Sequence, residues 1–320
     1  MRKYFPLVIA LAAAMAAGAL LGQVAVFPLN DETLPILLHF RLPRVAFAAV
    51  NGAALALAGV LYQIALRNPM AEGFTTGAAS SAALGGCLAL ALWGNSVLVS
   101  LSAMAFAAVG VCVICSIAAR SSVAAMGAER VTVILAGIAL SVVAGSGIGF
   151  LKYFFEDSLS AMVFWLMGGL HGATWTKTAW LLAVFLAALA FLLRRRDQLA
   201  LMLLDDASAR ASGVDVRAMR GAIFVITTAL VAVSVSFCGV IGFLGLMVPH
   251  AVRAMIGHNV TVQLIAAPLL GAVLLTLFDL VSRTVLPYGG ELPVGIITSA
   301  AGGCFFFILL MRRGNGVWGS

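Results

Sequence analysis

Apolar residues occur along this chain in blocks of about 20, the number that spans the hydrocarbon layer of a membrane as an α-helix. Short breaks rich in Gly, Pro and Arg separate the blocks. Hydrophobic residues make up 63% of the 320 positions and charged residues 10%, whereas a soluble domain carries roughly 25% charged residues. The sequence therefore predicts an all-α, polytopic membrane protein in which residues 1–320 form a single transmembrane domain.

Ten blocks are predicted to span the membrane. They cover residues 4–26, 45–66, 75–93, 97–119, 131–155, 176–193, 221–240, 244–256, 260–281 and 293–311. The eighth block is short and contains Gly and Pro, which predicts a partial or tilted helix whose freed backbone groups are buried in protein. A further short helix over residues 158–167 is expected at the membrane surface.

The distribution of Lys and Arg predicts the orientation. An even number of spans places both termini on one side, and if that side is the cytoplasm, fourteen of the 19 basic residues lie inside. The five outer ones are Arg41, Arg44, Lys152, Lys177 and Arg283. The positive-inside rule then favours a multi-pass protein with both termini cytoplasmic. The net charge of +7 is spread over loops, so it does not indicate a nucleic-acid surface.

Two predicted spans carry small residues at intervals of four. The stripe in the fifth span is Gly137, Ser141, Gly145 and Gly149, and the stripe in the tenth span is Gly295, Ser299 and Gly303. Small residues let helix backbones approach closely in lipid. The same stripes could also form the smooth wall of a transport pathway, and the two interpretations are compatible.

Enzyme chemistry is missing from the sequence. It contains no G-x-x-x-x-G-K-[ST] phosphate loop and no H-E-x-x-H zinc motif. We therefore expect no catalytic residues, no metal site and no cofactor on this chain, so that any ATP is hydrolysed by another chain. Asp279 stands four residues before Arg283, which favours a local ion pair. The alternative is a proton site of a secondary transporter at Asp279 or Glu156.

The longest internal loop, residues 194–220, holds ten charged residues. A short helix is predicted from about Asp205, with Gly213 as its C-terminal cap, and a second is predicted to begin near Asp215. Two short helices across the inner face would form a docking platform for a partner. An ordinary solvated loop is the alternative.

Six motifs occur in an order that resembles a known family. They are Arg41-Leu42-Pro43-Arg44, Asn68-Pro69-Met70-Ala71-Glu72, Leu135-Ala136-Gly137, Phe164-Trp165-Leu166-Met167-Gly168-Gly169, Gly242-Phe243-Leu244-Gly245-Leu246-Met247-Val248-Pro249-His250 and Glu291-Leu292-Pro293-Val294-Gly295. Together they resemble the FecCD or vitamin B12-type permeases of ABC importers, over nearly the whole chain.

The resemblance implies a type II ABC importer permease of about ten helices that works by alternating access. Its implied location is the bacterial inner membrane. Its implied partners are a second permease copy that forms a homodimer with it, two ATPase subunits that hold ATP and Mg, and an external substrate-binding protein. The implied cargo is a metal chelate such as an iron-siderophore, haem or cobalamin, and occasionally an oxyanion. An ion-gradient-driven secondary transporter and a non-transporting membrane scaffold stay open as alternatives.

The resemblance also implies roles for particular residues. Docking of the binding protein falls on Arg41, Arg44 and Arg283, for which anchoring a helix end at the lipid headgroups is the alternative. Contact with the ATPase falls on Asp205, Asp206, Ala207, Ala209, Arg210 and Gly213. A cytoplasmic gate falls on Asn68, Met70, Arg130 and Val131. The sequence departs from the family where Asp205-Asp206 replaces Gly-Glu and where Met70 replaces Leu.

Overall fold

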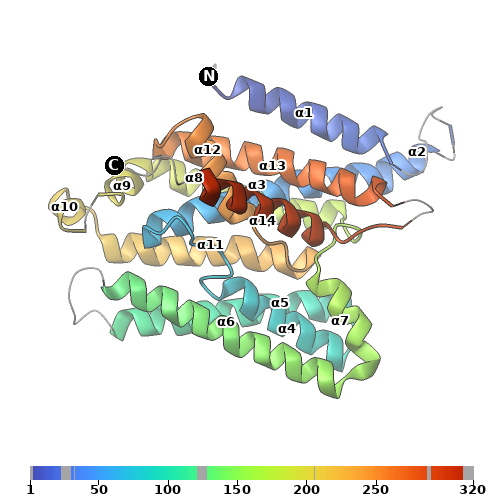
Figure 1. The fold of residues 1–320 in the computed structure, drawn as a ribbon, viewed down its shortest axis with the longest axis horizontal. Coiled ribbons are helices and arrows are strands. Elements are labelled where there is room, and N and C mark those ends of the chain that lie inside the picture. Colours follow the sequence, from blue (N-terminus) through green and yellow to red (C-terminus); the bar gives the residue numbers. More distant parts are fainter. Residues whose placement is uncertain are drawn as a thin grey trace.

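The computed structural model describes residues 3–22, 30–31, 33–120, 128–204, 206–286 and 290–312. Within these ranges the regular structure is helical and contains no strand, which confirms the predicted all-α class. Most of the helices run roughly along the longest axis of the molecule (Figure 1). Ordered by sequence, they are α1 (Phe5–Leu20), α2 (Thr33–Pro35), η1 (Ile36–Arg41), α3 (Leu42–Leu66), α4 (Ala78–Leu92), α5 (Ser96–Arg120), α6 (Ala128–Phe154), η2 (Glu156–Ser158), α7 (Leu159–Leu166), α8 (Trp175–Arg194), α9 (Arg196–Leu201), α10 (Asp206–Ala211), α11 (Val216–Cys238), α12 (Leu244–Met255), α13 (Val260–Thr284) and α14 (Val294–Arg312).

Each predicted span coincides with a helix, and the predicted surface helix is α7. Six helical segments of the described residues are long and apolar enough to cross a membrane, and α1, α4 and residues 294–309 are shorter apolar helices. The 12-residue α12 contains Pro249 and buries most of its side chains, as expected for a partial helix inside the protein. The count of ten spans stays a prediction.

The predicted start of the second span is wrong. The helix begins at Thr33 and continues through the π-helical turn η1 into α3, so Arg41 and Arg44 lie within a helix and not before one. In η1 the N–H of Leu42 bonds the carbonyl of Leu37, five residues back. This wider turn accommodates the pyrrolidine ring of Pro43, which would clash in a regular α-helix.

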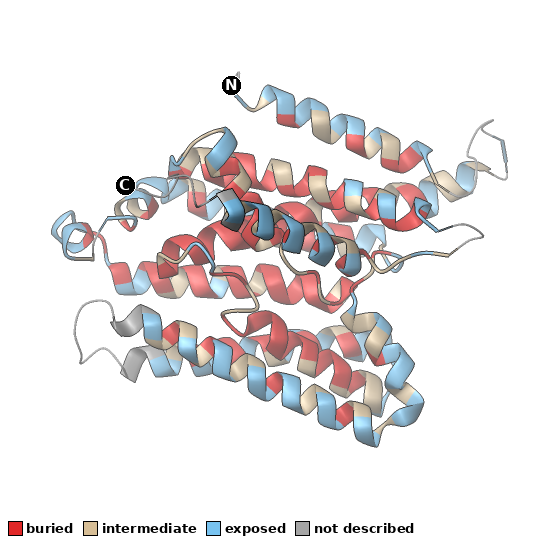
Figure 2. Cartoon of the chain, in the orientation of Figure 1, coloured by how far each residue is buried: buried red, intermediate tan, exposed pale blue. Residues whose placement is uncertain are grey.

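The helix α3 forms the centre of the molecule. In its apolar window 89% of the residues are buried, against 17% for the peripheral α6 (Figure 2). Close approach of neighbouring helices explains this burial. A Cβ added at Gly52 would overlap the carbonyl of Gly271 in α13, and one at Gly59 would overlap the carbonyl of Gly245 in α12. Small residues therefore let two backbones contact α3 directly.

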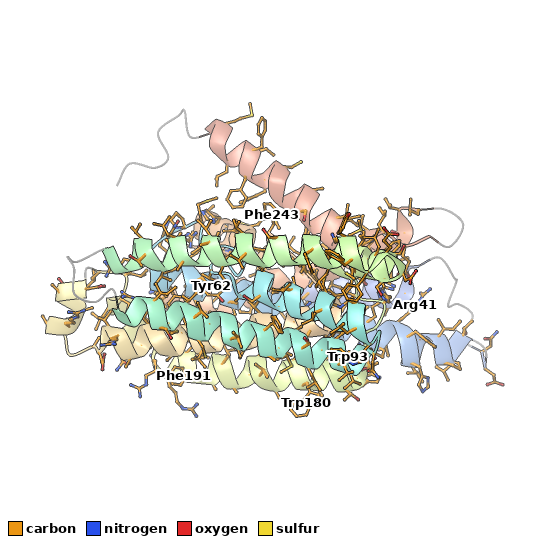
Figure 3. All side chains as sticks on the ribbon, turned by 90° about the horizontal axis from the view of Figure 1, so that it is seen from below. Arg41, Tyr62, Trp93, Trp180, Phe191 and Phe243 are labelled. Carbon is orange, nitrogen blue, oxygen red and sulfur yellow. The ribbon has the colours of Figure 1, made fainter. Side chains whose placement is uncertain are left out.

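The molecule has two ends along its long axis. The helix α10 lies at one end, and α1 begins and α14 finishes in the same half of the molecule (Figure 1). Arg41 lies at the other end, and the exposed Trp93 and Trp180 lie in the same half of the molecule (Figure 3). Exposed tryptophans are typical of the membrane interface. We refer below to the α10 end and the Arg41 end.

Candidate functional site

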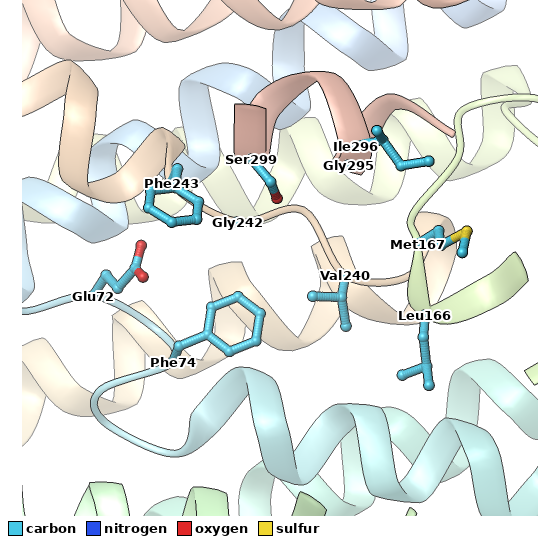
Figure 4. A pocket seen from close by; sticks show the side chains of 10 residues that line it. All are labelled: Glu72, Phe74, Leu166, Met167, Val240, Gly242, Phe243, Gly295, Ile296 and Ser299. Atoms are coloured by element: carbon cyan, nitrogen blue, oxygen red, sulfur yellow. The ribbon is translucent and has the colours of Figure 1, made fainter. Parts of the chain in front are cut away.

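A cavity of about 520 Å³ opens between the two ends. Its lining includes Glu72, Phe74, Met167, Phe243, Gly295 and Ser299. The Glu72 carboxylate and the Ser299 hydroxyl lie at its edge, beside the rings of Phe74 and Phe243 (Figure 4). Glu72 is the one ionisable side chain among the described residues that line this space. The cavity is thus apolar and aromatic, with a single acid.

The turn between α3 and α4 holds Glu72 in place. The side-chain oxygen of Asn68 accepts a hydrogen bond from the Met70 N–H at 2.9 Å, and Thr76 Oγ1 donates to the Glu72 carbonyl at 3.0 Å. Burial raises the pKa of the Glu72 carboxyl to about 7, whereas a hydrogen bond from the Phe243 backbone N–H lowers it. Because Phe243 directly precedes α12, the carboxylate also lies at the positive end of that helix.

The small-residue stripe of α6 serves two purposes. Gly137 packs against the backbone of Thr75 and Thr76, and Ser141 Oγ donates to the carbonyl of Phe74 at 2.8 Å. This half of the stripe is close helix packing. Gly145 and Gly149 are exposed, and a Cβ on either would meet open space. The second half is therefore free to face lipid or another chain.

The stripe of α14 divides in the same way. Gly295 packs against the carbonyls of Met167 and Val240 and lines the cavity, as does Ser299. Gly303 is exposed with nothing near its Cα. The first part of α14 thus forms cavity wall.

A buried charge cluster occupies the Arg41 end. Asp279 of α13 lies 2.9 Å from Arg44 Nε and 3.0 Å from Arg283 Nε, which confirms the predicted ion pair with Arg283 and adds a second one. Arg44 also binds both carboxylate oxygens of Glu291, at 2.9 and 3.0 Å. The Asp279 carboxylate is thus neutralised from two sides.

The three arginines assigned to docking all lie in this cluster, and two of them also cap α1. Arg41 donates to the carbonyls of Ala19 and Leu20, and Arg283 donates to the carbonyl of Gly18. The last carbonyls of a helix lack intrahelical partners and carry partial negative charge, so guanidinium groups stabilise them. Both arginines are buried, and all three line a hollow of about 430 Å³ that also includes His171 and Glu291.

The charged loop at the other end contains α9 and α10. Gly213 adopts a φ of +83°, its N–H bonds the Arg210 carbonyl, and the Val214 N–H bonds the Ala209 carbonyl. This is a Schellman motif, so the predicted cap of α10 is confirmed. Ala209 is buried, whereas Ala207 and Arg210 are exposed.

The predicted second short helix near Asp215 is wrong. Asp215 does cap a helix, because its carboxylate accepts the Ala218 N–H at 2.9 Å. That helix is α11, whose apolar pattern carries it on to Cys238. The second short helix of the loop is α9, before α10. The predicted contact Asp205 lies outside the described residues.

The predicted gate residues belong to two elements. Asn68 and the exposed Met70 lie in the turn after α3, and Val131 is exposed near the start of α6. The side chain of Arg130 lies outside the described residues. The contacts between α6 and this turn are made further along, at Gly137 and Ser141.

Sequence reasoning did not single out three side chains of the candidate site. Glu72 and Glu291 appeared there only as letters of motifs, although a lone acid beside apolar blocks is a usable signal. Arg67 appeared only as an inner basic residue. Arg67 contacts Met202, 135 residues later in the chain, and Asp206, 139 residues later. No local sequence pattern predicts such contacts.

Comparisons with known proteins agree with this geometry. The profile of the FecCD transport family matches residues 6–312. The hemin transport system permease protein of Yersinia pestis is 36% identical over 89% of this chain and 85% of its own length. The cobalamin import system permease protein of Halobacterium salinarum is 34% identical over 85% and 72%. A solved structure described as a metal-chelate type ABC transporter in an inward-facing conformation has a TM-score of 0.89 and 28% identity, over 97% of this chain and 99% of its own.

Proposed function

Because the chain belongs to the FecCD transport family, we propose that it moves a metal chelate across the membrane as the permease subunit of an ATP-binding-cassette importer. The observation that carries the proposal is the arrangement along one axis. An arginine cluster lies at one end, an apolar cavity lies between the ends, and a capped, exposed helix lies at the other end. A permease needs these three parts, one for delivery, one for passage and one for the motor.

The cargo is a bulky chelate. The cavity offers aromatic and aliphatic surface with one carboxylate, whereas a bare ion would need several charged or carbonyl ligands. The names of the relatives include hemin and cobalamin, which are both large metal chelates. The cavity of one chain is one half of a pathway, which a second copy completes.

The second copy packs on the exposed apolar sides of α6 and α14. Gly145, Gly149 and Gly303 leave open space there for a facing helix. In such a homodimer the remaining stripe residues Gly295 and Ser299 border the shared pathway. Asn68, Met70, Arg130 and Val131 form its gate on the cytoplasmic side.

An external binding protein docks at the Arg41 end. Arg44 is the best placed of the three arginines, because its partner Glu291 is 42% exposed and can exchange for a carboxylate from outside. The guanidinium groups of Arg41 and Arg283 already donate hydrogen bonds to carbonyls at the end of α1. These two arginines therefore orient the site and supply positive charge to it. The hollow of about 430 Å³ gives an acidic side chain room to enter.

Two partner ATPases, which hold ATP and Mg, dock on the exposed face of α10 with Ala207, Arg210 and Gly213. The α10 end is then cytoplasmic, and so are both termini. In this orientation the chain lies in the bacterial inner membrane. Side chains along the inner loop carry excess positive charge, as the positive-inside rule requires.

Uptake in membrane vesicles tests the proposal. The chain, its ATPase and its binding protein are expected to accumulate a labelled chelate when ATP is supplied and the proton gradient is collapsed. Uptake driven by an ion gradient without any ATPase would refute the importer and favour the secondary transporter. The two ion pairs of Asp279 argue against that alternative, because Arg44 and Arg283 already engage its carboxylate.

A further inference from the structure

The side chain of Asp206 turns from the docking helix α10 into the protein. Its Oδ2 lies 3.2 Å from Arg220 of α11, and its Oδ1 lies 3.4 Å from Arg67, the residue that ends α3. Ala209, one turn further along α10, is buried on the same side. The helix thus has an outer face for a partner and an inner face with a charged attachment. In this half-buried setting an ion pair is stronger than on an open surface.

Arg67 ends α3 in an unusual backbone conformation. Its φ is +45° and its ψ is +38°, the left-handed region, which residues with a Cβ rarely adopt. Its Nε donates a 2.8 Å hydrogen bond to the carbonyl of Met202, between α9 and α10. Arg67 therefore has two contacts with the loop that carries α10. The direction in which the chain leaves α3 depends on this loop.

The chain that leaves Arg67 leads directly to the cavity. Asn68 begins a tight turn in which the Ala71 N–H bonds the Asn68 carbonyl at 3.1 Å. Glu72 follows, with its N–H bound to Thr75 Oγ1 at 2.8 Å and its side chain at the cavity edge. These bonds make residues 68–76 a compact unit. A displacement of Arg67 will therefore move the Glu72 side of the cavity with it.

We infer that Arg67 is the positioning residue that carries movement of the docking helix α10 to the wall of the cavity. The inference rests on the proposed function, because it assumes that a partner ATPase moves α10. Asp206 transmits that movement to Arg67, and the left-handed backbone at Arg67 is the point where α3 ends and the turn swings. Arg220 shares the same carboxylate but lies within α11, away from the turn, so it steadies α10 without moving the cavity wall.

The test compares three variants in liposomes that contain the chain with its ATPase and binding protein. They are Arg67→Gln, the matched control Arg220→Gln, and the conservative variant Arg67→Lys, which keeps a positive charge beside Asp206. The measured quantity is labelled chelate taken up per ATP hydrolysed. We expect Arg67→Gln to lower this ratio about tenfold while ATP is still hydrolysed, and Arg220→Gln to lower it much less. Arg67→Lys is expected to keep most of the ratio, because its ammonium group can still pair with Asp206.

A second measurement separates positioning from simple loss of structure. Met70 is exposed, so the rate at which a thiol reagent modifies Met70→Cys, in a chain without its native cysteines, reports on the turn. In the otherwise unchanged chain ATP is expected to change this rate. In Arg67→Gln the rate is expected to be the same with and without ATP, although the complex still co-elutes with its ATPase.

Three outcomes would overturn the inference. An unchanged uptake ratio in Arg67→Gln would show that the turn moves without it, and equal losses in both glutamine variants would reduce Asp206 to an anchor for α10. An uptake ratio in Arg67→Lys as low as in Arg67→Gln would assign the loss to the bond with Met202 instead. If the unaltered chain shows no ATP-dependent uptake, the proposed function itself fails, and that result is distinct from the other three.

Discussion

Replacing Asp279 by Asn tests whether the charge cluster at the Arg41 end stabilises the fold. The Asp279 side chain is 1% exposed and lies 2.9 Å and 3.0 Å from two guanidinium groups. Asparagine keeps its size but removes its charge, so three guanidinium groups then face the single carboxylate of Glu291. Loss of one partner from a buried ion pair typically costs about 3–5 kcal/mol. We expect the free energy of unfolding to fall by that amount.

Glu291→Gln is the matched control, because Glu291 and Asp279 bind the same Arg44. The Glu291 side chain is 42% exposed, and an exposed ion pair contributes only about 0–1 kcal/mol. Both substitutions remove a carboxylate from Arg44, and Asp279→Asn also removes the partner of Arg283. Their difference therefore measures the effect of burial together with this second ion pair.

Thermal unfolding of the purified protein in detergent measures both variants. The midpoint is expected to fall by on the order of 5 °C for Asp279→Asn and to stay nearly unchanged for Glu291→Gln. Equal shifts would refute the argument from burial. In vesicles the folded fraction of Asp279→Asn should still take up chelate with ATP when the proton gradient is collapsed. Complete loss of uptake by well-folded protein would instead show that transport itself needs the Asp279 carboxylate.

Three further substitutions test other features. Gly52→Ala places a Cβ on the carbonyl of Gly271 and should lower the free energy of unfolding by about 1–3 kcal/mol, measured by thermal unfolding. Gly221→Ala is the control, because its Cβ meets open space and should leave the free energy of unfolding unchanged. Equal losses would contradict the close packing at Gly52. Folding raises the pKa of the Glu72 carboxyl to about 7, so this carboxyl destabilises the fold once it ionises. Glu72→Gln should therefore become more stable than the unaltered protein as the pH rises from about 4.5 to about 7, by up to about 3 kcal/mol. A stability difference that does not vary with pH would rule this out. Gly213→Ala forces a Cβ into a φ of +83° and should weaken co-elution with the ATPase through fraying of α10, at a cost of about 1–2 kcal/mol; wild-type co-elution would show that the cap is dispensable.

Hydropathy located the helices because a helix that spans a membrane needs about 20 consecutive apolar residues, and such blocks are visible in the sequence. It placed the start of the helix that holds Arg41 and Arg44 too late, because the apolar block begins only after these arginines, whereas a π turn extends the helix before them. Gly213 was predictable as a cap, because a left-handed position after a short helix has a strong local preference.

Local patterns could not reveal the long-range contacts of the site. Asp279 and Arg283 are four residues apart, so their pairing was predictable, but the contact of Asp279 with Arg44 joins positions 235 residues apart. In the same way nothing near Arg41 in the sequence shows that its partners are the last carbonyls of α1. The spacing of the stripe in α6 predicted that its residues share one face of the helix, but not what this face contacts. Packing at Gly137 and open surface at Gly145 depend on neighbours that are distant in the chain.

The helix that runs from Thr33 to Leu66 places Arg44 near one end of the molecule and Arg67 just beyond its other end. These arginines are 23 positions apart in the chain, which corresponds to about 35 Å of α-helix. If the nucleotide state of the ATPase alters the affinity for the binding protein through this helix, the binding protein must alter the nucleotide affinity by the same factor. Each tenfold change in these two affinities corresponds to a coupling free energy of about 1.4 kcal/mol between the two binding sites. Measured with saturating partners, the two titrations would form a closed thermodynamic cycle across the membrane.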